Sequence, residues 1–223
     1  MMLAVAGVSA QSVPDDSDDA QFWNETTVAI PLKRKENADG SKTDIVNLNV
    51  LATLRLGRGG LNPVDKRLGL GFDIRLNKAF ILSPSYYFRA GEPVTGQKET
   101  EHRLRLDLAT EKKFSPVSLK WRGRLEHRFR LDSSDSTRLR NKGTLKIPVK
   151  ANNKELFSPF VAEEIFFEFQ SGRFSSHEFT AGVSKEVVKG ISAELFYIRK
   201  DNRSGDVRTI NGVGLNLKIY LGR

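Results

Sequence analysis

The chain contains no cysteine, which excludes a disulfide framework and any metal site built from thiolates. No run of about eighteen apolar residues occurs either, so the sequence predicts no transmembrane helix. The three histidines are scattered, and no glycine-rich loop carries the Lys-Ser/Thr ending of a phosphate-binding loop. We therefore expect a protein that is not an enzyme and that holds no cofactor and no metal.

Acidic residues are also under-represented: 27 Asp and Glu stand against 36 Lys and Arg, a formal net charge of +9. This excess predicts an anionic partner, such as nucleic acid, lipid phosphate or an acidic solute. The mean hydropathy is low, at −0.40. A low value does not argue against a membrane protein, because the strands of a membrane barrel give half of their positions to polar residues that face the lumen.

What the chain has in abundance is alternation of apolar and charged residues, most clearly in the segment Val117–Leu131. There the apolar residues Val117, Leu119, Trp121, Leu125, Phe129 and Leu131 share one parity, and Lys, Arg and Glu take the other. A period of two predicts a β-strand with one apolar and one charged face. The run is longer than the five or six residues of an ordinary strand. It fits a tilted strand that crosses a bilayer, with its apolar face toward lipid.

Eleven alternating runs follow one another with little helical periodicity, which predicts an antiparallel meander. They are Phe22–Leu32, Asp44–Leu56, Arg67–Asn77, Ala79–Arg89, Glu101–Glu111, Val117–Leu131, Thr137–Val149, Phe157–Gln170, His177–Val188, Ile191–Lys200 and Val207–Leu221. Short and longer connections alternate, as in outer-membrane barrels, and bacterial single-chain barrels have an even number of strands. We predict an all-β, closed, antiparallel up-and-down transmembrane β-barrel of twelve strands, one of them missed near the N-terminus, with ten as the alternative.

The N-terminal residues differ in composition from the rest. Residues 1–10 are apolar and small and read as the remnant of a signal peptide that is cleaved after Ala10. Residues 11–20 form an acidic linker, and residues 21–223 form the barrel. We expect the mature protein in the bacterial outer membrane, with its C-terminus at the periplasmic rim of short turns.

The charged face predicts a network of side chains inside the barrel. Its members are Arg103, Arg105, Asp107, Arg122, Arg124, Glu126, Arg128, Arg130, Arg138, Arg140, Lys142, Glu164 and Glu168. Along this parity basic residues clearly outnumber acidic ones. Two interpretations stay open: a lumen filled by salt bridges, or an anion-attracting pore lined by arginine forks.

A simple hairpin register specifies the expected pairs within this network. It places Glu101 opposite Arg128, Arg103 opposite Glu126, and Asp107 opposite Arg122, and opposite charges across a strand pair stabilise a sheet. Extended to the next strands, the pattern places Glu126 opposite Lys142 and Arg130 beside Arg138. Glu164 and Glu168 then reach Lys142 and Arg138.

A second set of polar residues falls on the outward parity. The same registers place His102, His127 and Asn141 side by side near the rim of longer loops, where they would pack at the depth of lipid headgroups. The row has residue types found in lipid hydrolases, but no serine is present in it to act as a nucleophile. Glu163 is also outward, and the sequence offers no partner for it.

Several strand motifs resemble a known family. They are His102-Arg-Leu-Arg, Arg122-Gly-Arg-Leu-Glu-His-Arg128, Arg138-Leu-Arg140 and Pro159-Phe-Val-Ala-Glu-Glu164-Ile-Phe-Phe. Together they resemble the bacterial outer-membrane β-barrel family catalogued as domain of unknown function 2490, over residues 20–223. The resemblance implies an outer-membrane location and no established activity, so no catalytic residue is carried over. The ending Tyr220-Leu-Gly-Arg223 departs from the aromatic last residue that such barrels commonly have.

The sequence is compatible with three functions. The first is a channel or binding barrel for anionic solutes. The second is a closed structural barrel with a salt-bridged interior, and the third is a soluble basic β-protein that binds nucleic acid through its arginine face. For the first two functions, we expect outer-membrane lipid and lipopolysaccharide as partners, a small anionic solute as a further partner, and no nucleic acid. The sequence does not predict an oligomeric state.

Overall fold

The computed structural model describes residues 18–131, 133–152 and 154–222, and its regular elements are β-strands. They are β1 (Asp18–Glu36), β2 (Lys42–Gly57), β3 (Asn62–Arg75), β4 (Phe80–Gly91), β5 (Glu99–Phe114), β6 (Val117–Arg130), β7 (Ser136–Lys146), β8 (Val149–Ala151), β9 (Lys154–Glu168), β10 (Arg173–Val188), β11 (Ile191–Asn202) and β12 (Thr209–Tyr220). Nowhere in these ranges does a helix reach the length and apolar character needed to cross a membrane.

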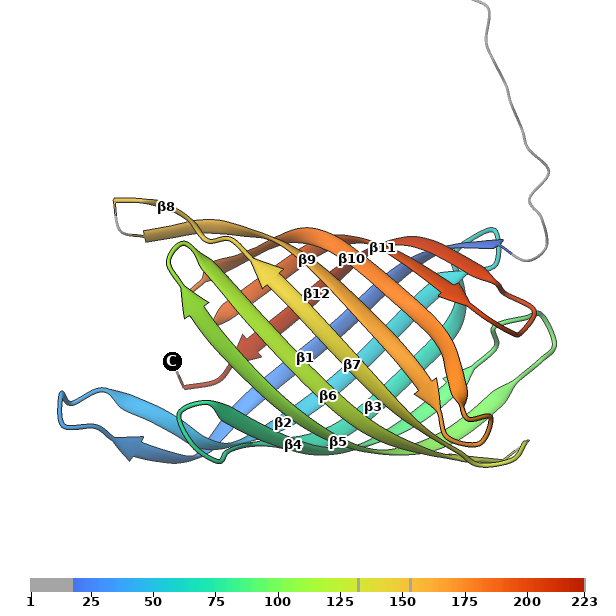
Figure 1. Ribbon diagram of the computed structural model, residues 1–223, viewed down its shortest axis with the longest axis horizontal. Helices are drawn as coiled ribbons and strands as arrows, with labels where there is room; N and C mark the ends of the chain where they lie inside the picture. The colour runs from blue at the N-terminus through green and yellow to red at the C-terminus, as the bar shows by residue number, and fades with distance from the viewer. Residues whose placement is uncertain (1–17, 132, 153, 223) are drawn as a thin grey trace, which may run out of the picture.

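The strands form a closed barrel, as predicted (Figure 1). Successive strands pair antiparallel from β1 to β7, then through β9, β10, β11 and β12, and β12 pairs with β1 to close the ring. Within the described residues twelve strands are present, but eleven of them make the ring. The remaining strand, β8, pairs only with β9. The twelfth strand was expected near the N-terminus; instead it comes from the predicted run Thr137–Val149, which ends as β7 and resumes as β8.

The seam of the barrel, where β1 pairs with β12, is the one departure from the expected antiparallel pattern in the described chain. Strands β1 and β12 run parallel, in register from Asp18 opposite Thr209 to Ala29 opposite Tyr220. An odd number of crossings makes this unavoidable, because the first and last strands of the ring then point the same way. The backbones approach closely here: a Cβ atom on Gly212 would collide with the backbone oxygen of Gln21. Glycine at this position therefore permits the seam.

The two faces of the strands have the polarity of a membrane barrel. On the outer face large apolar side chains stay accessible, for example Leu68 at 66% and Leu195 at 65%. On the inner face charged side chains are enclosed, with Arg103 at 3% and Glu126 at 0% exposed. This is the reverse of a soluble protein, in which accessible apolar surface is limited in extent. The alternation read from the sequence thus predicted both faces.

The barrel begins slightly earlier than predicted. Residues 1–10, read as a signal remnant, lie outside the described residues, and so does most of the predicted linker 11–20. The last three residues of that linker already belong to β1, because Asp18, Asp19 and Ala20 pair with the start of β12. Cross-strand hydrogen bonding therefore extends the domain into the acidic segment.

Candidate functional site

The charged network is set by the register of β5 against β6, which differs from the prediction by two residues. Glu101 lies opposite Arg130, Arg105 opposite Glu126, and Asp107 opposite Arg124. The predicted pairs Glu101–Arg128, Arg103–Glu126 and Asp107–Arg122 are therefore wrong, although each residue points inward as expected. The cause is the turn: pairing continues as far as Phe114 opposite Val117, so the hairpin is tighter than the sequence suggested.

The register of β6 against β7 differs from the prediction by four residues. Glu126 lies opposite Arg138, not opposite Lys142, which faces Arg122. Arg130 is not beside Arg138, because the pairing with β7 stops at Arg128 opposite Ser136. The following register, β7 with β9, agrees with the prediction: Glu164 lies opposite Lys142 and Glu168 opposite Arg138.

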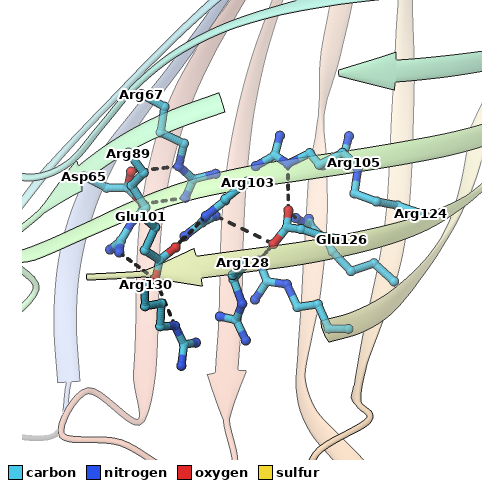
Figure 2. A network of polar contacts seen from close by, with 12 residues as sticks. Asp65, Arg67, Arg89, Glu101, Arg103, Arg105, Arg124, Glu126, Arg128 and Arg130 are labelled. Atoms are coloured by element: carbon cyan, nitrogen blue, oxygen red, sulfur yellow. Dashed lines mark hydrogen bonds and ion pairs between the residues drawn. The ribbon is translucent and has the colours of Figure 1, made fainter. Parts of the chain in front are cut away.

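Glu126 is the centre of the network (Figure 2). Its carboxylate lies 2.7 Å from Nε of Arg105, 2.6 Å from Nη2 of Arg138, 3.8 Å from Nη1 of Arg103 and 4.0 Å from Nη1 of Arg140. The four guanidinium groups come from the two strands that flank β6. A single enclosed carboxylate therefore links arginines of both neighbouring strands.

Other carboxylates complete the lattice on the same wall. Glu164 lies 2.7 Å from both Arg122 and Arg140. Asp107 accepts two hydrogen bonds from Arg124, each at 2.7 Å, and Glu168 lies 2.6 Å from Arg128. Lys142 faces Glu164 across the strands but makes no ion pair within the described residues. The structure thus gathers the predicted inward residues onto one wall, strands β5 to β9.

Two cavities lie toward the two rims of the lumen, and the first of them reaches this wall. One, of about 320 Å³, lies on the side of the longer loops and is called here the loop-side chamber. It is lined by Gln21, Arg55, Val64, Asp65, Arg67, Arg89, Pro93, Glu99, Glu101, Arg103, Arg128, Arg130, Ser133, Arg138, Lys200 and Ile210. The other, the turn-side chamber, measures about 520 Å³ and is lined by Arg34, Lys42, Thr43, Asp44, Ile45, Asn47, Asp73, Arg75, Ile81, Lys218, Tyr220 and Gly222.

Several guanidinium N–H groups in the loop-side chamber have no acceptor. Arg103 Nη1 and the Nε atoms of Arg55, Arg128 and Arg138 are buried without a hydrogen-bond partner in the described residues. Carboxylates do not satisfy them, because the three acids of this chamber are engaged by other nitrogens. Buried donors without partners are costly, so these groups favour an acceptor oxygen nearby, that of a water molecule or of a bound anion.

The opposite wall of the lumen holds residues that the sequence reasoning missed. Glu25 shares its parity with buried Trp23 and stays accessible inside the ring. The guanidinium groups of Arg105, Arg122 and Arg124 act on its carboxylate electrostatically, but none forms an ion pair with it. The alternation within Phe22–Leu32 and Asp44–Leu56 assigns Trp23, Glu25 and Arg55 to the inward face, so parity is the signal that identifies them.

The loops above the loop-side chamber are tied together. Glu92, which follows β4, accepts hydrogen bonds at 3.0 Å from the backbone N–H of Gly96 and from Arg58, which follows β2. The Gly96 hydrogen bond, with that from Arg58, holds the pKa of the Glu92 carboxyl below its usual range. This anchors the connection from β4 to β5, and Pro93 in it lines the chamber.

The outward polar row is not assembled as predicted. His127 lies opposite Leu104 and Asn141 opposite Gly123, so the three side chains are not side by side. His102 instead bonds to the hydroxyl of Tyr86 at 2.6 Å, and His127 to that of Thr137 at 2.7 Å. The row does not form because the registers of β5 with β6 and of β6 with β7 differ from the predicted ones.

Glu163 is outward, as the sequence indicated, and has a partner. Its carboxylate lies 3.2 Å from Nδ1 of His177, whose Nε2 lies 3.4 Å from Asp201. No group of three metal-ligating side chains occurs in the described ranges.

Comparison with known proteins gives one family and one fold neighbour. The family model described as Protein of unknown function (DUF2490) matches residues 20–211. Among solved structures, one titled "NanC porin structure in rhombohedral crystal form" is similar, with a TM-score of 0.47 and 10% sequence identity, covering 86% of this chain and 94% of that chain. No curated protein matches the chain.

Proposed function

This chain belongs to the DUF2490 family, and from that premise we propose that it is an outer-membrane β-barrel whose basic lumen takes up small anionic solutes and lets them pass. A closed barrel with an accessible apolar outer face fits a bilayer, since every strand is paired and no polar edge meets lipid. Lipid and lipopolysaccharide would surround it. The proposal includes no enzymatic activity.

The observation that carries the proposal is the charge imbalance of the loop-side chamber. Eight basic side chains line it against three acidic ones, and four of its arginines each have a buried guanidinium nitrogen without a hydrogen-bond partner in the part of the chain that the structure describes. Arginine forks in a partly enclosed space bind carboxylates and phosphates at two points and attract them electrostatically. An anion is the class of solute that this arrangement would concentrate.

Passage through the barrel would follow the wall that carries Glu25. On the opposite wall Glu126 and Phe166 are enclosed, at 0% and 1% exposed. On that wall, however, the side chains of Arg122 and Arg124 remain 23% and 13% accessible. We infer that an anion would pass these two arginines and the accessible Glu25 of the facing wall, on whose carboxylate they act electrostatically.

The Glu25→Gln variant tests this path. Removing a negative charge about 4 Å from a passing anion lowers the energy of the anion by about 1 kcal/mol in water and raises that of a cation, so the anion-to-cation permeability ratio is expected to rise by at least about fivefold. The measurement is the reversal potential in a planar bilayer under a salt gradient. Glu163→Gln, on the outer face, is the matched control and is expected to leave the ratio unchanged. Conductance without any change in Glu25→Gln would contradict the path, and a folded barrel that never conducts would contradict the function.

A second candidate, the closed structural barrel, is favoured by the fully enclosed Glu126 and its four arginines. Such a barrel would be stable and would not conduct. The third interpretation, binding of nucleic acid, needs the arginine face to be open to solvent. The ring encloses Arg103, Arg105 and Arg140, so a duplex has no access to them.

The location can be tested directly. Expressed in a bacterial host with a working signal peptide, the protein is expected in the outer-membrane fraction and should migrate faster on a gel before heating than after. Closed barrels keep their compact form in detergent until heated, because their strands have no free edge. Recovery of the protein in the cytosol would count against the membrane assignment.

A further inference from the structure

Two cations of the loop-side chamber, Arg55 and Lys200, make no ion pair within the described residues although both are enclosed by the ring. Each is held by an aromatic ring: the guanidinium carbon of Arg55 lies 3.3 Å from the centre of Trp23, and Nζ of Lys200 lies 4.9 Å from the centre of Phe166. Contact with a ring face positions a cation without consuming its charge. Both groups are therefore fixed in place and remain free to meet an anion.

Three arginines from other strands line the same chamber. Arg103, Arg128 and Arg138 each use part of their guanidinium for a carboxylate, namely Glu101, Glu168 and Glu126. Each also has one buried N–H without a hydrogen-bond partner in the described residues. Because these N–H groups are covered by the lining of the chamber, they meet an entering anion only if the side chains turn toward it. The chamber thus combines fixed positive charge with unused donors.

These cations repel one another. Lys200 is acted on by the charges of Arg55 and Arg138, and the acid that acts on it is Glu178. Glu178 faces Lys200 across the strands but forms no ion pair with it. Convergence of like charges is unfavourable in an enclosed space unless a counter-charge enters. One monovalent anion would leave most of this excess uncompensated.

We propose that the loop-side chamber is a binding site for a phosphate group, either as the free ion or as the monoester of a small molecule. A phosphate offers more acceptor oxygens than a carboxylate and carries close to two charges, which suits donors that arrive from Arg55 and Lys200 on one side and Arg103, Arg128 and Arg138 on the other. A chamber of about 320 Å³ has room for the group and a small substituent. The inference rests on the proposed function and names the solute class of the same lumen.

Calorimetric titration of the purified, detergent-solubilised barrel tests the site. Inorganic phosphate, glycerol phosphate and acetate are titrated in turn at low ionic strength, with folding of each variant verified by its gel shift on heating. Phosphate is expected to bind more tightly than acetate. The double variant Arg55→Gln and Lys200→Gln removes charge-assisted hydrogen bonds and should weaken phosphate binding by at least about tenfold. The control carries the same two changes on outward positions, Lys66→Gln and Arg199→Gln, and should bind as the unchanged protein does.

The outcomes separate this inference from the function on which it rests. Equal affinity for phosphate and acetate, or equal phosphate affinity in the Arg55/Lys200 variant and its control, overturns the phosphate site. If the barrel conducts anions while phosphate produces no heat, the site falls and the proposed function stands. If it neither conducts nor binds, both fall. Glycerol phosphate binding as well as the free ion supports a monoester as the solute, and binding of the free ion alone supports phosphate itself.

Discussion

Replacing Glu126 with glutamine is expected to lower the free energy of unfolding of the barrel by about 3–5 kcal/mol, the cost of removing one partner from a buried ionic group. The carboxylate is fully enclosed and is shared by arginines of β5 and β7. Without it, Arg105 and Arg138 lose the one carboxylate with which they pair in the described residues, whereas Arg103 and Arg140 keep Glu101 and Glu164. Denaturant unfolding in detergent, followed by the fluorescence of Trp23 and Trp121, measures the loss.

Two further variants decide whether the loss comes from uncompensated charge. Glu163→Gln removes an exposed carboxylate on the outer face and should cost no more than about 1 kcal/mol. Adding Arg138→Gln to Glu126→Gln removes one of the arginines left alone, so it should restore part of the stability, as coupled residues do. Equal losses for Glu126→Gln and Glu163→Gln would show that the lumen network does not hold the barrel together.

Replacing Gly212 with valine is expected to prevent the barrel from closing. Any Cβ atom at this position meets the backbone oxygen of Gln21 across the seam, and main chain cannot move aside as a flexible side chain does. The seam carries the pairing of β1 with β12, so its loss leaves two strand edges without partners. The variant should lose the heat-dependent shift on gels and be degraded in cells.

Gly143→Val provides the matched control, because a Cβ at Gly143 in β7 would meet no atom within 4 Å. This variant should fold and shift as the unchanged protein does. A Gly212→Val protein that behaves in the same way would contradict the parallel seam. Failure of both variants would show instead that β-branched residues are not tolerated at strand glycines in general.

Alternation in the sequence predicted which side chains face inward, because a period of two assigns every residue of a strand to one face. It could not predict which charges meet. A shift by an even number of residues keeps every face and changes every partner, so Glu126 faces Arg105 and Arg138 instead of Arg103 and Lys142. Turn length decides between such registers. The tight turn after Phe114 was not recognisable from residue types alone.

The sequence predicted that the ring closes, but single strands do not show which side chains closure brings together. Arg55 lies between two leucines and Lys200 between Arg199 and Asp201, and neither stands out in its own strand. They line one chamber because β2 and β11 are brought near each other by the pairing of β1 with β12. An even number of strands, which most bacterial barrels have, makes the first and last strands antiparallel and so excludes a parallel seam. That rule is not a physical necessity.

The odd ring has a consequence for labelling from the two sides of a membrane. The start of β1 and the end of β12 lie at opposite rims of the barrel (Figure 1). In a membrane-spanning barrel of this kind, Asp18 at the start of β1 and Tyr220 at the end of β12 would lie on opposite sides of the bilayer. Two labels placed beside these residues would then respond to reagents added on opposite sides.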